Sequence, residues 1–165
     1  MSIHNYLIFT IVAGLGLLLD QATKLYIDHN MTLYSSIPVI DSIFNITYVR
    51  NPGAAFGVFA ESGFRIPFLV GVSLIALIAI IVAVRKLSVK EKGTVVALSF
   101  IFAGAGGNLI DRIRLGEVID FLDVYWKNYH WPAFNLADSA ICLGVFMYAA
   151  FTLKEERQRS LINQV

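Results

Sequence analysis

Three aspartates in the second half of the chain are the residues best suited to chemistry. Asp138 interrupts an otherwise uncharged apolar stretch that includes Pro132, and Asp120 and Asp123 lie in the segment just before it. Two neighbouring carboxyl groups cannot both ionise easily, so one keeps a proton while the other stays charged. Such a pair can bind a water molecule, take its proton and protonate a departing amine. The pattern predicts peptide hydrolysis by a dyad in which Asp138 pairs with Asp120 or with Asp123.

Several polar residues also have a structural interpretation. Asp138 could pair with Lys24 or Arg112 for packing alone, although an isolated intramembrane aspartate is by default a functional residue. Asp20 and Lys24 have the i, i+4 spacing of a stabilising pair at a helix end. Asp111 and Arg112 end an apolar stretch, where a buried charge needs a partner. In this interpretation the same residues would only hold helices together.

Two asparagines could serve the carboxylates directly. Asn108 and Asn135 offer donors and acceptors that can orient a carboxylate or a peptide backbone. Their structural alternative is hydrogen bonding between helices. The run 103–107, Ala-Gly-Ala-Gly-Gly, is typical of close helix packing, because small residues let two backbones approach.

Other hydrolytic chemistries find little support. The sequence has no His-Glu-x-x-His and no Gly-x-Ser-x-Gly pattern. One cysteine and three scattered histidines give no zinc-ligand spacing, so we expect no metal and no other cofactor. A serine–lysine dyad using Lys24 stays open but has no positional support.

The elements that must position these residues are predicted to be membrane-spanning helices. The chain is 57% hydrophobic and 15% charged, whereas a soluble domain has roughly 25% charged residues. A bilayer core needs roughly 20 mostly apolar helical residues. Four stretches qualify, at about 3–20, 66–84, 93–111 and 131–153. We predict an all-α polytopic membrane protein that forms a single domain over residues 1–165, with the first span retained because it lacks signal-peptide flanks.

The distribution of basic residues orients the spans. The connection between the second and third spans and the C-terminal tail are rich in Lys and Arg: Arg85, Lys86, Lys90, Lys92, Lys154, Arg157 and Arg159. The positive-inside rule makes these segments, and hence both termini, cytoplasmic. The polar ends of the spans then converge on the outer face, which predicts a site there. The net charge of +1 and the lack of a long basic run exclude a nucleic-acid partner.

Two outer segments, 24–63 and 113–131, complete the predicted architecture. Residues 38–59 mix β-branched and aromatic residues around a turn at Asn51-Pro52-Gly53, which predicts short strands forming a small β-platform. The second segment is an aromatic-rich connector of the kind found at membrane interfaces. Its aromatic residues are Phe121, Tyr125, Trp126, Tyr129 and Trp131.

Five ordered motifs carry a family resemblance. They are Asp20-Gln-Ala-Thr-Lys24, Arg50-Asn-Pro-Gly-Ala-Ala-Phe56, Gly107-Asn-Leu-Ile-Asp-Arg112, Gly116-Glu-Val-Ile-Asp-Phe121 and Phe134-Asn-Leu-Ala-Asp138. With these motifs at the expected span boundaries, the chain closely resembles bacterial lipoprotein signal peptidase, also called signal peptidase II. The resemblance covers essentially the whole chain from the first span to the fourth.

The resemblance implies a membrane aspartic peptidase with four transmembrane helices and a periplasmic β-platform in the bacterial cytoplasmic (inner) membrane. It implies a catalytic dyad of Asp120 and Asp138, which resolves the choice against Asp123. It also implies supporting residues at Asp20, Lys24, Asn51, Gly53, Asn108, Asp111, Arg112, Asn135 and Ala137. The implied substrate is a prolipoprotein whose cysteine already carries diacylglycerol, cut just before that cysteine, and the implied inhibitor is globomycin. We expect a monomer surrounded by membrane lipids.

Two functions of other classes compete with this hypothesis. A small transporter could use Asp120 and Asp138 in a polar pathway, but the second and third spans carry no charge that would continue the pathway to the cytoplasm. A non-enzymatic assembly subunit could use the charged residues only to pair helices. Two carboxylates placed for shared protonation argue against that role.

Overall fold

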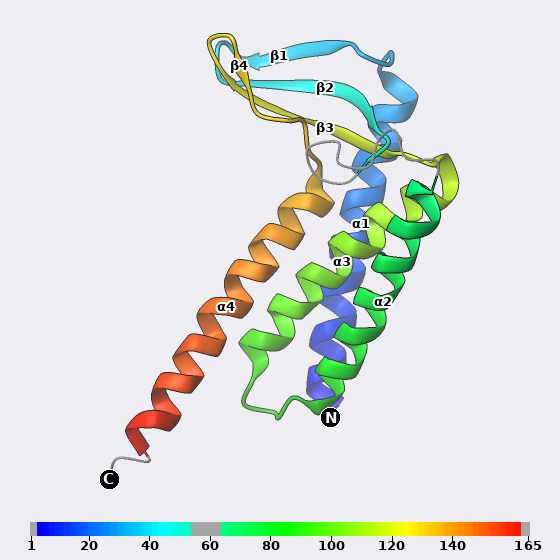
Figure 1. The fold of residues 1–165 in the computed structure, drawn as a ribbon. Coiled ribbons are helices and arrows are strands. Elements are labelled where there is room, and N and C mark those ends of the chain that lie inside the picture. Colours follow the sequence, from blue (N-terminus) through cyan, green and yellow to red (C-terminus); the bar gives the residue numbers. More distant parts are fainter. Residues whose placement is uncertain (1–2, 54–63, 163–165) are drawn as a thin grey trace.

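The computed structural model describes residues 3–53 and 64–162. Within these residues the chain forms four long helices and a small sheet (Figure 1). The helices are α1 (Ile3–Asn30), α2 (Arg65–Lys86), α3 (Lys92–Leu115) and α4 (Leu136–Ile162). Each contains a stretch long and apolar enough to cross a membrane. The four predicted spans are confirmed, and the chain is a multi-pass membrane protein.

The sheet lies at one end of the helices, opposite the connection between α2 and α3 (Figure 1). It is antiparallel, and its strands follow the chain order. They are β1 (Ser36–Ile40), β2 (Phe44–Asn51), β3 (Val118–Trp126) and β4 (Tyr129–His130). The β-platform predicted at 38–59 is therefore found in β1 and β2, while residues 54–59 of that range lie outside the described part of the chain.

The central helix of the bundle is α3, which packs against α1, α2 and α4. Its small residues make this possible, because a larger side chain would push the neighbouring helices away. A Cβ atom on Gly104 would collide with the backbone carbonyl of Ala137 on α4. The outer faces of the other helices are apolar and exposed; Ile75 on α2 is 69% and Phe146 on α4 75% exposed. These faces suit a lipid environment.

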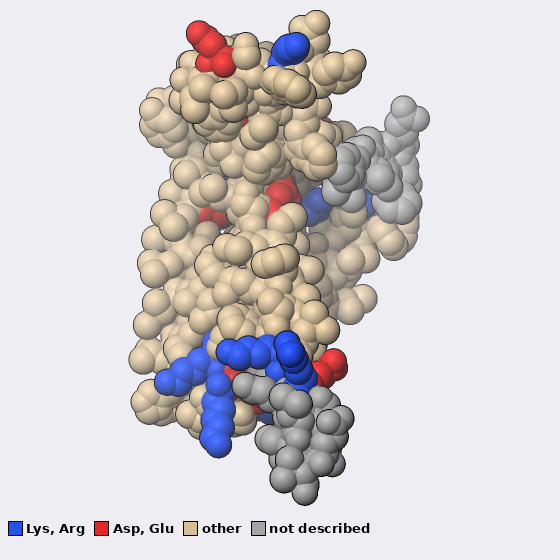
Figure 2. Space-filling model, turned by 90° about the vertical axis from the view of Figure 1, so that its left-hand side faces the viewer, with Lys and Arg blue, Asp and Glu red and all other residues tan. Residues whose placement is uncertain are grey.

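Charges avoid the middle of the molecule. Figure 2 shows a largely uncharged band, with Lys and Arg side chains gathered at the end where α2 and α3 are joined. Arg85 and Lys86 lie in the last turn of α2. This is the arrangement that the positive-inside rule describes at a cytoplasmic face.

The helix boundaries differ from the predicted spans at several places, including the end of α4, which continues past residue 153 to Ile162. Helix α1 continues from the predicted end at residue 20 to Asn30, because Asp20 and Lys24 are buried inside the protein and do not face lipid. Helix α3 likewise continues to Leu115. Helix α4 begins at Leu136, five residues after the predicted start at residue 131, so Asp138 lies in its first turn and not about one and a half turns inside the span. Apolar length marks the bilayer crossing but not the helix end.

The outer connector was predicted only as an aromatic-rich segment, yet residues within 113–131 form β3 and β4. Strand β3 pairs with β2 along most of its length, placing Asp120 opposite Val49 and Asp123 opposite Asn45. Of the aromatic residues, Trp126 and Tyr129 are exposed and Phe121 is buried in the core between the sheet and α1. The connector is thus half of the platform.

Candidate active site

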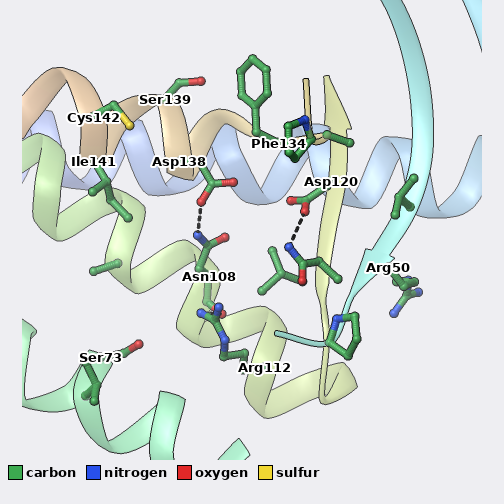
Figure 3. A pocket seen from close by; sticks show the side chains of 18 of the residues that line it. Arg50, Ser73, Asn108, Arg112, Asp120, Phe134, Asp138, Ser139, Ile141 and Cys142 are labelled. Carbon is green, nitrogen blue, oxygen red and sulfur yellow. Dashed lines mark hydrogen bonds between the residues drawn. The ribbon is translucent and has the colours of Figure 1, made fainter. Parts of the chain in front are cut away.

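Asp120 and Asp138 line one cavity of about 1150 Å³ (Figure 3). Asp120 comes from β3, where it is 2% exposed. Asp138 comes from the first turn of α4. Successive side chains of a strand point to opposite faces, so Val118 and Asp120 reach the same cavity. The strand and the helix N-terminus thus bring two carboxyl groups to one wall.

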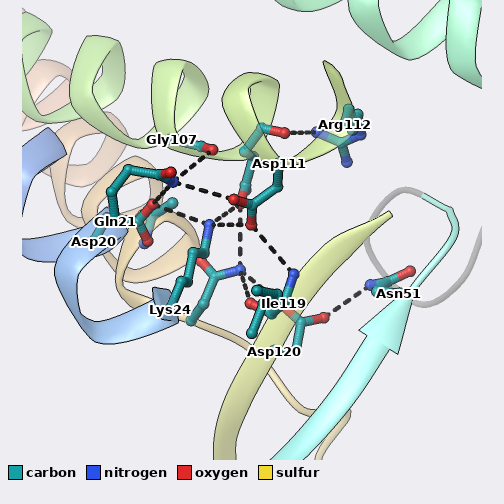
Figure 4. A network of polar contacts seen from close by, with 12 residues as sticks. Asp20, Gln21, Lys24, Asn51, Gly107, Asp111, Arg112, Ile119 and Asp120 are labelled. Atoms are coloured by element: carbon teal, nitrogen blue, oxygen red, sulfur yellow. Dashed lines mark hydrogen bonds and ion pairs between the residues drawn. The ribbon is translucent and has the colours of Figure 1, made fainter. Parts of the chain in front are cut away.

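Two asparagines connect these carboxyl groups. The side-chain nitrogen of Asn108 donates to Asp138 Oδ1 at 2.8 Å, and that of Asn135 donates to Asp120 Oδ1 at 2.7 Å. Asn135 also donates to the side-chain oxygen of Asn108 at 3.2 Å. On the other side of Asp120, Asn51 donates to Oδ2 at 3.0 Å (Figure 4). Hydrogen bonds from side-chain amides therefore fix the orientation of each carboxyl group.

The position of Asp138 follows from the way α4 begins. The side-chain oxygen of Asn135 accepts from the backbone N–H of Asp138 at 2.9 Å, and Asp138 Oδ2 accepts from the backbone N–H of Asn135 at 3.2 Å. This reciprocal pair has the spacing of a capping box, which satisfies two otherwise unpaired N–H groups. The residue pair that starts the helix also orients the site carboxylate.

Asp20, Lys24 and Asp111 form a buried ion cluster that contacts Asn108 (Figure 4). The Lys24 ammonium is fully buried and lies 3.0 Å from Asp20 Oδ2 and 3.0 Å from Asp111 Oδ2. It donates to Asn108 Oδ1 at 2.9 Å. The predicted Asp20–Lys24 pair is confirmed. The partner that a buried charge at Asp111 was expected to need is Lys24.

The two carboxylates of this cluster also hold the backbone around the site. Asp20 Oδ1 accepts from the N–H of Ala137 at 2.9 Å, and Asp111 Oδ2 accepts from the N–H of Ile119 at 3.2 Å. Ala137 precedes Asp138, and Ile119 precedes Asp120. The cluster therefore fixes both elements that carry the dyad candidates.

Sequence reasoning missed Gln21. Its side-chain nitrogen lies within hydrogen-bonding distance of Asp20 Oδ2 at 3.1 Å, Gly107 O at 3.1 Å and Asp111 Oδ1 at 3.2 Å. The signal available in the sequence was its place in the polar motif that begins at Asp20. It was overlooked because Gln21 is neutral, and the interpretation of this motif considered only its two charged residues, Asp20 and Lys24.

Arg112 contacts Gly53, the residue two positions after Asn51. The Arg112 guanidinium donates to the carbonyl of Gly53 at 3.2 Å and to the carbonyl of Asn108 at 3.4 Å. The N–H of Gly53 donates to the side-chain oxygen of Asn51 at 3.0 Å. Arg112 also lines the cavity. Asn51 is thus fixed by the turn that follows it and by the carboxyl group that it contacts.

Asp123 takes no part in this arrangement. It accepts from Asn45 at 2.8 Å, and its Oδ1 lies 2.8 Å from His130 Nδ1. It is not among the residues that line the cavity. Because Asp123 stands at an odd spacing from Asp120 along β3, it points to the opposite face. Of the two alternatives left open by the residues alone, the structure brings Asp120 to Asp138.

The surroundings of Asp120 favour its protonated form. Burial, together with the nearby Asp138 carboxylate, raises its pKa from 3.8 to about 7. The amide donors Asn51 and Asn135 and the charge of Lys24 act the other way. A carboxyl group that is half protonated near neutral pH, beside a second carboxyl group, suits proton exchange with water.

Comparisons with known proteins place the chain in a family. A family model described as "Signal peptidase (SPase) II" matches residues 12–154. A "Lipoprotein signal peptidase" of Geobacter metallireducens is 54% identical over 159 residues, covering 96% of this chain and 98% of that protein. Another of that name, from Geobacter sulfurreducens, is 58% identical over 156 residues, covering 94% of this chain and 98% of that protein.

Solved structures agree with this placement. A structure described as "Bacterial membrane enzyme structure by the in meso method at 2.3 A resolution" superimposes with a TM-score of 0.81 at 35% identity, covering 90% of this chain and 88% of the other. A second, described in the same words but at 1.9 A, gives a TM-score of 0.78 at 37% identity, covering 88% and 92%. By sequence and by fold, the chain belongs to the signal peptidase II family.

Proposed function

We propose that the chain is a membrane aspartic endopeptidase that removes the signal peptide from diacylglyceryl-modified prolipoproteins. The cut falls just before the lipidated cysteine. Family membership and the name of the relatives support signal-peptide removal from prolipoproteins. The observation that carries the aspartic mechanism is the placement of Asp120 and Asp138 on one cavity wall, bridged by Asn108 and Asn135.

In the proposed reaction Asp138 is ionised and Asp120 is protonated. Asp138 takes a proton from a water molecule, whose oxygen attacks the scissile carbonyl carbon while Asp120 gives its proton to the carbonyl oxygen. The tetrahedral intermediate then collapses: the hydroxyl proton returns to Asp120, the C–N bond breaks, and Asp138 passes its proton to the leaving amine. Both carboxyl groups return to their starting states, and no covalent intermediate forms.

The remaining predicted residues have supporting roles in this proposal. Asn51 and Arg112 line the cavity and are joined through Gly53, so they can contact the peptide backbone of the substrate. The cavity is also lined by apolar side chains from three helices: Val72, Ala76, Ile101, Ala105 and Ile141. An apolar signal peptide or an acyl chain arriving from the bilayer suits such a wall.

The proposal includes a location. The protein lies in the bacterial inner membrane as a monomer surrounded by lipid, with both termini cytoplasmic and the dyad toward the periplasm. The basic end of the bundle supports this orientation, because it lies opposite the sheet (Figure 2). A lipid-anchored substrate then presents its scissile bond at the depth of the dyad, and globomycin competes for the same cavity.

Cleavage of a purified diacylglyceryl prolipoprotein in detergent tests the proposal. Asp120→Asn and Asp138→Asn should each abolish turnover while the protein still inserts and folds. Asp123→Asn is the matched control, because it removes a carboxylate from the same strand but outside the cavity, and it should keep most of the activity. The same substrate without its lipid should not be cut. Wild-type cleavage by either dyad variant would overturn the aspartic mechanism.

A further inference from the structure

Asp28, Tyr48 and Arg50 form a polar clasp between the end of α1 and the middle of β2, outside the proposed dyad. The Tyr48 hydroxyl donates to Asp28 Oδ1, and the Arg50 guanidinium donates to the same oxygen and to the Tyr48 hydroxyl, each at 2.8 Å. The guanidinium of Arg50 also lies 5.4 Å from the centre of the Tyr48 ring. Each member thus contacts the other two, which fixes the backbone of β2 relative to α1.

The clasp lies where β2 departs from regular pairing. The register between β2 and β3 shifts between Ile46 and Val49, so Tyr48 lies within the irregularity. Tyr48 is 4% exposed and packs in a core cluster with Ile27 of α1 and Ile119 of β3. A bulge redirects the strand that follows it. The direction of β2 after the bulge is therefore set by what Tyr48 and Arg50 contact.

The next residue after the clasp reaches the dyad. Asn51 follows Arg50 directly and donates to Asp120 Oδ2 at 3.0 Å. The Arg50 side chain itself is turned away from Asp120 and Asp138 (Figure 3), so it makes no direct contribution to the dyad. A hydrogen bond of this length tolerates little displacement of its donor. The clasp therefore holds the segment that ends in Asn51, and Asn51 makes the contact with Asp120.

We infer that Asp28, Tyr48 and Arg50 are positioning residues for the peptidase reaction, acting through Asn51 on Asp120. The inference rests on the proposed function, since it gives Asp120 a role in catalysis. Unlike an ordinary packing contact, the clasp affects the position of a hydrogen-bond donor to Asp120. Loosening it weakens the donor to one oxygen of Asp120, while the variants tested below keep Arg50, which also lines the cavity.

The pH profile separates positioning from simple stabilisation. The charged groups that act on Asp120 are Asp138 from α4, Lys24 from α1 and Arg112 from α3, and the clasp variants leave all three unchanged. Asn51 favours the ionised form of Asp120 by donating to it. Weakening that donor should move the alkaline limb of kcat to higher pH, a change that a smaller amount of folded protein cannot produce.

The experiment compares Asp28→Asn and Tyr48→Phe with wild type in the lipidated-substrate assay, with kcat expressed per folded molecule. Tyr48→Phe keeps the ring in the core and removes only the hydroxyl, so it guards against a variant that fails to fold. We expect kcat to fall about tenfold with KM within about twofold, because misplacement of a site group reduces rate more than binding. The alkaline limb should move upward in both. Asp123→Asn, which breaks contacts at the other end of the sheet, should change neither quantity.

A double-mutant cycle tests the route of the effect. If the clasp acts through Asn51, adding Asp28→Asn to Asn51→Ala should lower kcat by less than about twofold, since the coupled contact is already gone. The inference would be overturned if the double variant lowered kcat by the product of the two single effects. It would also be overturned if both clasp variants had the kcat and the alkaline pH limb of wild type. Asp120→Asn in the same assay distinguishes the two failures: if it is active, the proposed function falls, and if it is inactive while the clasp variants behave as wild type, only the clasp role falls.

Discussion

The Lys24 ammonium donates to the side-chain oxygen of Asn108 at 2.9 Å. Because that oxygen is taken, the amide nitrogen of Asn108 faces Asp138, to which it donates at 2.8 Å. A fully buried cation on α1 thus determines which atom of an asparagine on α3 meets a carboxylate on α4. The ion cluster that the sequence left open as a packing feature also orients the site.

Replacing Lys24 by Met should damage both stability and activity. The substitution leaves Asp20 and Asp111 buried without their cation, and breaking a buried pair costs about 3–5 kcal/mol. Freed from the ammonium, Asn108 should lose its orientation, and kcat should fall by at least about 100-fold. Thermal denaturation in detergent and the cleavage assay measure the two effects.

The double variant Lys24→Met/Asp111→Asn provides the control. It removes one of the two unpaired carboxylates, so it should be more stable than Lys24→Met alone while remaining inactive. Wild-type cleavage by Lys24→Met would show that the cation has no part in orienting the dyad.

The stability of the protein should depend on Asp120 as the pH changes. Below about pH 4 the carboxyl group is protonated whether the chain is folded or unfolded. Between pH 4 and 7 the unfolded chain ionises first, because the folded-state pKa is raised from 3.8 to about 7. The free energy of unfolding therefore falls by up to about 4 kcal/mol over this interval, and the fall is complete above pH 7.

The variant Asp120→Asn cannot ionise, so it should lack this loss. The difference in free energy of unfolding between the variant and wild type should grow in favour of the variant from pH 4 to 7 and then level off. Denaturation followed at several pH values measures the difference. A constant difference across that interval would mean that Asp120 has an ordinary pKa.

Glycines on α3 should be intolerant where they contact α4. A Cβ atom on Gly104 would collide with the carbonyl of Ala137 and lie 2.7 Å from Ile141 Cγ1. Gly104→Ala should destabilise the protein by about 1–3 kcal/mol through overpacking. It should also lower kcat, because Ala137 precedes Asp138.

Gly14→Ala on α1 is the matched control. Nothing lies within 4 Å of the added methyl group, so stability should stay the same or rise by at most about 1 kcal/mol. Equal effects of the two substitutions on denaturation temperature and on kcat would contradict the close-packing account of α3.

The transmembrane architecture was predictable because it depends on apolar length. Inside a bilayer, four long and mainly apolar stretches can pair their backbone polar groups only by forming helices. The helix ends were not predictable in the same way. Helix α4 begins where Asn135 and Asp138 cap it, and hydropathy cannot detect a hydrogen bond. Strand β3 was missed because Asp120 and Asp123 interrupt its apolar alternation.

The sequence predicted which residues form the site better than it predicted which of them contact one another. Asp138 stood out because a charge inside an apolar stretch is costly. Residue reasoning alone left Asp120 and Asp123 equal, since their separation by the faces of a strand becomes visible only once β3 is recognised. Which carboxylate faces Lys24 depends on how α1 and α3 pack. For that reason the sequence left the partner of Asp111 open and gave Gln21 no role.

Infrared spectroscopy of the purified protein tests whether Asp120 and Asp138 share a proton, as proposed. We predict a protonated-carboxyl band that disappears as the pH rises, with a midpoint near the pKa of about 7 for Asp120. The band should be absent from Asp120→Asn and unchanged in Asp123→Asn. If no carboxyl band titrates near neutral pH, or if the band persists in Asp120→Asn, the proton-sharing pair at the centre of this account does not exist.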